Sequence, residues 1–270
     1  MARKRIQISG KHIPRRRQTT RSEQAKPSSD FGWIYGQHAC MAAVANPRRK
    51  IHRLVATREV GASFANIHAD ITVEIIKRSE IELLLPSGAV HQGVALLASP
   101  LPVVTVADII ERAKKNERIL VVALDQVTDP QNVGAIIRSA SALGADALLV
   151  PDRHTPEISG ALTKAASGAV EKIPIIRPSN LVRALETLKS AGLWVVGLDV
   201  EAPNSLSEVD LPGKCILAVG AEGKGLRRLT SETCDLRAHI PMIGDIQSLN
   251  VSAGAAIALY EWSKQKGTKY

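Results

Sequence analysis

The chain has 270 residues, 45% of them hydrophobic, and a formal net charge of +9, which suits one large globular domain or two smaller domains that each have a core. No run approaches the roughly 18 consecutive apolar residues that span a bilayer, and the N-terminus lacks the apolar segment of a secretory signal, so the sequence predicts no membrane partner. Three cysteines without a CxxC pair and seven histidines without an HExxH motif favour a reducing, cytoplasmic location and argue against a metal site.

Residues 1–30 carry most of the charge, with nine Lys and Arg against Glu23 and Asp30, a net of +7. Such a segment neutralises phosphates without reading sequence, so we interpret it as a disordered basic tail that adds affinity for nucleic acid. Two alternatives stay open. The tail is a solvated segment without a partner, or, being rich in Arg and poor in acids, it is a transit peptide that directs the protein to an organelle matrix.

Residues 31–98 predict a first, small α/β domain. The apolar patterns indicate helices at 38–45 and 58–68 and strands at 51–56 and 89–98. Pro100 and Pro102 follow, and proline is unfavourable inside a helix and inside a central strand. Residues 99–106 are therefore interpreted as a linker between two domains.

Residues 107–270 predict a second domain built on a parallel sheet. Short apolar runs alternate with helical patterns, and runs without polar alternation indicate strands that are buried on both faces. These runs lie at 119–124, 147–150, 173–176, 193–198 and 215–219. A final helix is predicted at 251–264, and the fold class is α/β.

Three polar, glycine-containing segments follow predicted strands. They are NVGAIIR at 132–138, GAEGKGL at 220–226 and IPMIGDIQSLNVS at 240–252. Because ligands bind outside the carboxyl ends of parallel strands, these segments are candidates for the walls of one pocket. The second segment fits neither a P-loop, which needs Ser or Thr where Gly225 stands, nor GxGxxG, which needs glycine where Arg228 stands. This spacing argues against a nucleotide triphosphatase or an oxidoreductase.

Together the three segments resemble the motifs of the SpoU, or TrmH-type, branch of the SPOUT RNA methyltransferases, in the same order and at matching separations. The resemblance covers residues 119–263. Upstream, YGQH at 35–38 and AVHQG at 89–93 are similar to the N-terminal domain of the RlmB subfamily, which methylates a guanosine ribose in large-subunit ribosomal RNA.

The resemblance implies S-adenosylmethionine as methyl donor, a deep trefoil knot in the C-terminal domain and a homodimer. It also implies that the preceding domain is a small ribosomal-protein-like module that binds ribosomal RNA. Periodicity alone predicts an ordinary open sheet, because threaded chains are very rare. The expected activity is 2′-O-methylation of a ribose in RNA. Transfer RNA as the substrate, and a non-catalytic RNA-binding assembly factor, are the alternatives.

The resemblance implies a catalytic set whose central member is Arg138. A guanidinium is cationic at physiological pH and forks onto phosphate or alkoxide oxygens, so we expect Arg138 to stabilise the developing oxyanion rather than to accept the proton. Asn132 is interpreted as the first residue of its helix, where its side chain caps backbone N–H groups or orients Arg138. Glu222 is expected to pair with Arg138, within one chain or across the dimer; the alternative is a solvated loop carboxylate.

Ser248 and Asn250 complete the implied catalytic set. They lie beside the start of the last helix, a region of free N–H donors that suits a carboxylate or phosphate. By resemblance, these two residues surround the methyl donor together with Gly220, Ile240 and Leu249.

The predicted RNA-binding residues are Arg138, His91, Lys224 and Arg227. His91 lies in a strand pattern, where a histidine with a packing role alone is the alternative. Lys224 and Arg227 follow the second segment closely and contact the RNA backbone or are surface charge. One further string matches the family without a role that the sequence indicates: Lys164, Ser167 and Gly168.

Overall fold

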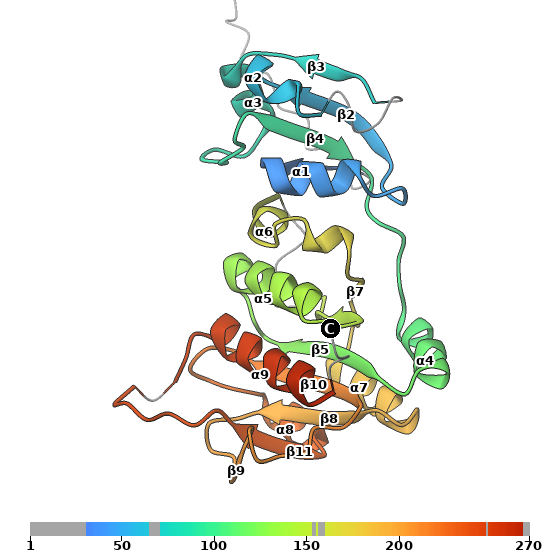
Figure 1. Ribbon diagram of the computed structural model, residues 1–270, viewed down its shortest axis with the longest axis vertical. Coiled ribbons are helices and arrows are strands. Elements are labelled where there is room, and N and C mark those ends of the chain that lie inside the picture. Colours follow the sequence, from blue (N-terminus) through green and yellow to red (C-terminus); the bar gives the residue numbers. More distant parts are fainter. Residues whose placement is uncertain (1–30, 65–70, 153–154, 156–159, 247, 267–270) are drawn as a thin grey trace, which may run out of the picture.

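The structure, a computed structural model, describes residues 31–64, 71–152, 155, 160–246 and 248–266 (Figure 1). The basic tail predicted at 1–30 lies outside these residues. Two sheets are present, and helices α1 (Gln37–Val44) and α6 (Gly160–Ala165) lie between them (Figure 1). Among the described helices, none combines the length and the apolar character that a membrane crossing requires.

The first sheet has four strands in the order β1-β4-β2-β3. Strand β4 runs antiparallel to β1 and β2, while β3 runs parallel to β2. The predicted strand at 51–56 and the helix near 38–45 are confirmed as β2 and α1. The bounds of the elements not yet named are β1 Gly32–Tyr35, β2 Ile51–Ala56, α2 Arg58–Gly61, β3 Val73–Ile75, α3 Arg78–Leu84 and β4 Val94–Ala98.

Two predicted elements in the first part of the chain, one helix and one strand, are shorter than expected. Helix α2 ends at Gly61, and part of the predicted helix 58–68 lies outside the described residues. Strand β4 begins only at Val94, because Gln92 and Gly93 have φ angles of 54° and 82°. This left-handed backbone is incompatible with an extended strand.

The second sheet has seven strands in the order β7-β6-β5-β10-β8-β11-β9, and every pairing is parallel. The predicted parallel sheet is thus confirmed. Strand β7 begins at Ile175 rather than Ile173, because Pro174 has no N–H to donate. The strand bounds are β5 Ile119–Asp125, β6 Ala147–Leu149, β7 Ile175–Ile176, β8 Trp194–Leu198, β9 Asn204–Ser205, β10 Lys214–Gly220 and β11 Leu236–His239.

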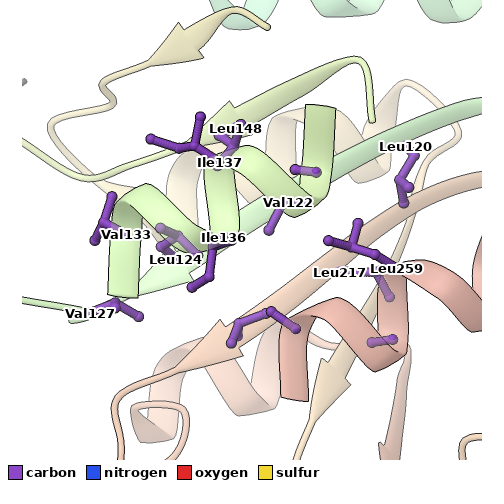
Figure 2. Close-up of a cluster of buried hydrophobic side chains, with 14 of the residues drawn as sticks. Leu120, Val122, Leu124, Val127, Val133, Ile136, Ile137, Leu148, Leu217 and Leu259 are labelled. Atoms are coloured by element: carbon purple, nitrogen blue, oxygen red, sulfur yellow. The ribbon is translucent and has the colours of Figure 1, made fainter. Parts of the chain in front are cut away.

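Helices cover both faces of this sheet. Along β5, Leu120, Val122 and Leu124 pack in one cluster with the helices α5 and α9 (Figure 2), and the residues between them pack against α4 and α7 on the other face. The expectation of strands buried on both faces is confirmed. Helix α5, which contains the first motif segment, and helix α9, which begins within the third, therefore lie on the same face. The helix bounds are α4 Val106–Lys115, α5 Pro130–Ala142, the 3-10 helix η1 Ala169–Glu171, α7 Leu181–Ser190, α8 Arg228–Thr233 and α9 Val251–Lys266.

A buried ion pair joins the two sheets. The Glu171 carboxylate accepts hydrogen bonds from Arg49 Nη2 at 2.6 Å and from Asn46 Nδ2 at 2.8 Å. The side chains of Arg49 and Glu171 are only 7% and 2% exposed. Because a charge at such a site needs its partner, this contact holds the first sheet in one position on the second.

We expect Glu171→Gln to lower the free energy of unfolding by about 3 kcal/mol, because the substitution leaves the Arg49 charge buried without its partner. Urea denaturation measures the change. Glu74→Gln is the matched control, since Glu74 pairs with Arg53 on the exposed surface and its loss is expected to cost at most about 1 kcal/mol. Equal effects of the two substitutions would contradict a joining role for Glu171.

Candidate active site

The first two motif segments start from adjacent strand ends. Strands β5 and β10 pair in register to their last residues, Asp125 and Gly220. The Asp125 carboxylate is fully buried and accepts hydrogen bonds from the backbone N of Arg227 at 2.8 Å and from its Nε at 2.6 Å. Asp125 therefore ties the loop after β10 to the end of β5.

The loop at 221–226 folds back onto its own strand. The backbone N of Ala221 donates to the Gly225 carbonyl at 3.0 Å, and the N of Gly225 donates to the Ala221 carbonyl at 2.8 Å. A Cβ on Gly220 would collide with the backbone of Gly225 and Leu226. This close approach of two backbone segments requires glycine at position 220.

The N-cap of helix α5 is not the residue that the sequence predicted. Asp129, not Asn132, is the N-cap, and its carboxylate accepts from the backbone N of Gln131 at 3.0 Å, with Pro130 at the first helical position. Asn132 is the third residue of the helix. Its Oδ1 instead accepts a hydrogen bond from Asn250 Nδ2 at 3.1 Å, which joins the first and third segments.

The third segment ends in a capped helix. Asn250 Oδ1 accepts from Ser252 N at 2.9 Å and from Ser252 Oγ at 2.6 Å, so Asn250 caps α9 while it bonds to Asn132. Ser248 and Leu249 are exposed, and Ile240 is half-buried. The amide of Asn250 thus sets the position of α9 relative to α5.

A cleft of about 360 Å³ opens where the three segments meet. Its wall combines an amide, a carboxylate and an ammonium group from Asn132, Glu222 and Lys224. Such a mixed polar wall suits the hydroxyls and phosphates of a nucleotide better than an apolar ligand. The lining residues are Gln126, Val127, Thr128, Asp129, Asn132, Ala221, Glu222, Lys224 and Val251.

Arg138 does not reach this cleft within one chain. It is exposed on α5, six residues after Asn132, and six helical residues rotate a side chain by about 240°. Among the residues that the structure describes, the Arg138 guanidinium has no hydrogen-bonding or ionic partner. The pairing of Arg138 with Glu222 is therefore not formed inside one chain.

His91 is not an RNA-facing strand residue. It lies in the turn before β4, its side chain is 2% exposed, and its Nδ1 accepts from the backbone N of Gly93 at 3.2 Å. Burial, with a smaller contribution from Arg78, lowers the pKa of His91 against the opposing effect of Glu82. The buried imidazole packs in its turn, so the expected RNA contact is withdrawn.

Asp125 and Asp129 are site residues that the sequence did not predict. The signal for Asp125 was a carboxylate at the end of the apolar run 119–125, where a buried acid needs a partner. Arg227, predicted to contact RNA, proves to be that partner. No group of three or more His, Cys, Asp or Glu in the described part of the chain could hold a metal ion.

Comparisons with known proteins identify the family of the chain. A family model described as the SpoU rRNA Methylase family matches residues 119–260, over half of the chain. The chain belongs to the SpoU rRNA methylase family. A second model, described as RNA 2′-O ribose methyltransferase substrate binding, matches residues 33–104. The SpoU match spans all three motif segments, and the second match spans the first sheet except Gly32.

Relatives extend this SpoU assignment over most of the chain. The 23S rRNA (guanosine-2′-O-)-methyltransferase RlmB of Pseudomonas aeruginosa is 37% identical over 88% of this chain and 98% of the relative. The SpoU methyltransferase AviRb from Streptomyces viridochromogenes, solved in complex with the cofactor AdoMet, has a TM-score of 0.70 at 26% identity, covering 88% of this chain and 91% of that one. An AdoMet-bound rRNA methyltransferase from Sinorhizobium meliloti has a TM-score of 0.72 at 25% identity, covering 87% of both chains.

Proposed function

We propose that the protein transfers a methyl group from S-adenosylmethionine to the ribose 2′-hydroxyl of a guanosine in large-subunit ribosomal RNA. The observation that carries this proposal is the meeting of the three motif segments at one cleft, through the Asn132–Asn250 hydrogen bond and the paired ends of β5 and β10. The activity printed for the P. aeruginosa relative supports the choice of substrate.

S-adenosylmethionine supplies an electrophilic methyl group when bound, and the residues at the strand exits fit such a molecule. The folded-back loop holds the backbone at Gly220 in a fixed position, while Ile240 and the 37% exposed Leu249 offer apolar side chains for an adenine ring. Ser248 offers an exposed hydroxyl for the polar end. The Asn250 amide is already engaged with Ser252 and Asn132, so its role is to shape the site.

The residues of the cleft position the acceptor ribose. The Nδ2 of Asn132 remains able to donate, because the Asn250 bond uses its oxygen alone. Lys224 can hold a phosphate, and Glu222 can orient a cationic group. Arg138 offsets the negative charge that grows on the ribose oxygen as its proton leaves.

A homodimer is part of this proposal, because the cleft of one chain lacks Arg138. We infer that Arg138 of the partner subunit completes it and pairs with Glu222. Exposed apolar side chains on α9, Ile257 at 41% and Tyr260 at 60%, suit a protein interface. The trefoil knot, the cytoplasmic location and the domain boundaries at 31–98, 99–106 and 107–270 stay predictions.

The test is transfer of labelled methyl from S-adenosylmethionine to RNA transcribed in vitro. We expect label on large-subunit ribosomal RNA, at a guanosine 2′-oxygen when ribose methylation is mapped. Label on transfer RNA alone would overturn the substrate. Binding of ribosomal RNA without label on any RNA would instead identify a non-catalytic assembly factor.

A further inference from the structure

Three family-like strings that the cleft does not use come together between the two sheets. A Cβ on Gly36, in the string YGQH, would lie 3.2 Å from Gln92 Oε1 and 3.5 Å from Lys164 Cγ. Gln92 belongs to the string AVHQG, and Lys164 lies on α6 in the other domain. We name the surface that Gln37, Gln92 and Lys164 form over the buried Gly36 the seam.

The two glutamines of the seam hold each other in a fixed geometry. The backbone N of Gln37 donates to Gln92 Oε1 at 3.2 Å, and Gln37 Nε2 donates to the Gln92 carbonyl at 3.3 Å. Gln92 adopts this position with a φ of 54°, which is unusual for a residue other than glycine. Both side chains are exposed, and within the described residues Gln37 Oε1 and Gln92 Nε2 have no partner. The seam therefore presents one fixed acceptor and one fixed donor to solvent.

Lys164 adds a positive charge to this amide pair. Its aliphatic stem packs against Gly36, and the side chain is half-buried. In the part of the chain that the structure describes, its ammonium has no carboxylate partner. A lysine whose stem is packed and whose charge is unpaired suits an anion that arrives from outside.

The seam is connected to the catalytic helix by rigid contacts. A Cβ on Gly134 would collide with Ala165, the neighbour of Lys164, so α6 crosses α5 between Asn132 and Arg138. The Arg49–Glu171 ion pair fixes the first domain at the far end of the same segment. Close packing of α6 on α5 therefore links the seam to the helix that carries Asn132 and Arg138.

We propose that the seam is a subsite for a single RNA strand that flanks the methylated nucleotide, a proposal that rests on the function proposed above. The Lys164 ammonium binds a backbone phosphate, and the free amide groups of Gln37 and Gln92 hydrogen bond to the edge of one nucleobase. An unpaired base exposes such an edge, whereas the deep major groove of an RNA helix hides it. The string around Lys164 thereby gains a role in placing the substrate.

The test compares Lys164→Met, which keeps the packed stem and removes the charge, with Lys164→Arg, which keeps the charge. The control is Lys115→Met, an exposed lysine of α4 on the opposite face of the second sheet. The affinity for a large-subunit ribosomal RNA transcript is measured at several salt concentrations, together with KM and kcat for methyl transfer. Melting temperature and S-adenosylmethionine affinity are measured for each variant.

We expect Lys164→Met to weaken RNA binding by about five-fold and to reduce the slope of log affinity against log salt by about 1, as the loss of one phosphate contact does. The loss should fall on KM more than on kcat, and Lys164→Arg should restore binding. Gln37→Ala should weaken binding without changing the slope, because an amide carries no charge.

A wild-type salt slope in Lys164→Met would overturn the seam as an RNA subsite. A loss of RNA affinity that Lys115→Met reproduces would do the same, and so would a fall in melting temperature or S-adenosylmethionine affinity that accounts for the effect. RNA binding that depends on Lys164 without any methyl transfer by the wild type would refute the proposed function and leave the subsite standing.

Discussion

Replacing Arg138 with alanine is expected to lower kcat for RNA methylation by about 10²- to 10³-fold, the usual loss when one group that stabilises a developing oxyanion is removed. The side chain is exposed and makes no hydrogen bond or ion pair among the described residues, so the substitution should leave the fold of the single chain intact. Arg183→Ala, on the exposed side of α7 across the sheet, is the matched control and should retain wild-type turnover.

Arg138→Lys separates charge from geometry. Lysine keeps the cation and loses the planar fork that binds two oxygens at once, so turnover should stay well below that of the wild type. Near-normal turnover in this variant would contradict the proposed role of the fork.

Mixed dimers decide whether Arg138 acts across the interface. Chains with Arg138→Ala are co-expressed with chains with Glu222→Ala, so that heterodimers form. If Arg138 serves the cleft of the opposite chain, one site of each heterodimer contains both substitutions and the other site contains neither. Activity that returns on mixing supports the proposed dimer. Mixed samples without activity would place Arg138 and Glu222 in the same chain's site.

Gly220→Ala is expected to lower the affinity for S-adenosylmethionine by roughly a hundredfold. The added methyl group collides with the backbone of Gly225 and Leu226, so the loop at 221–226 must move away from the end of β10. Overpacking of this kind costs about 3 kcal/mol. If the whole cost is borne by the loop conformation that binds S-adenosylmethionine, it corresponds to a loss of affinity of roughly a hundredfold. Isothermal titration calorimetry measures the affinity.

The control for this substitution is Gly32→Ala, because a Cβ at position 32 meets no atom within 4 Å. Gly32→Ala should bind S-adenosylmethionine like the wild type. Unchanged affinity in Gly220→Ala would show that the folded-back loop takes no part in binding the methyl donor.

Local patterns predicted the second domain well because its strands are buried on both faces. The run at 119–124 appears as β5, with neighbouring side chains packed in separate clusters above and below the sheet. The same reasoning failed around His91, where the apolar pattern continues through residues that form a turn. A left-handed φ at Gln92 delays the start of the strand to Val94, and composition carries no signal for that angle.

The sequence by itself determined the α/β class, the parallel sheet, the three motif segments and the family. These properties rest on burial and on short strings of residues that lie next to one another in the chain. Only the tertiary structure decided that Asn132 bonds to Asn250 across 118 residues, and that Arg227 bonds to Asp125 across 102 residues. It also decided that Arg138 points away from the cleft of its own chain. Such contacts depend on strand order and on how helices pack on the sheet. The local hydrophobic pattern determines neither of these.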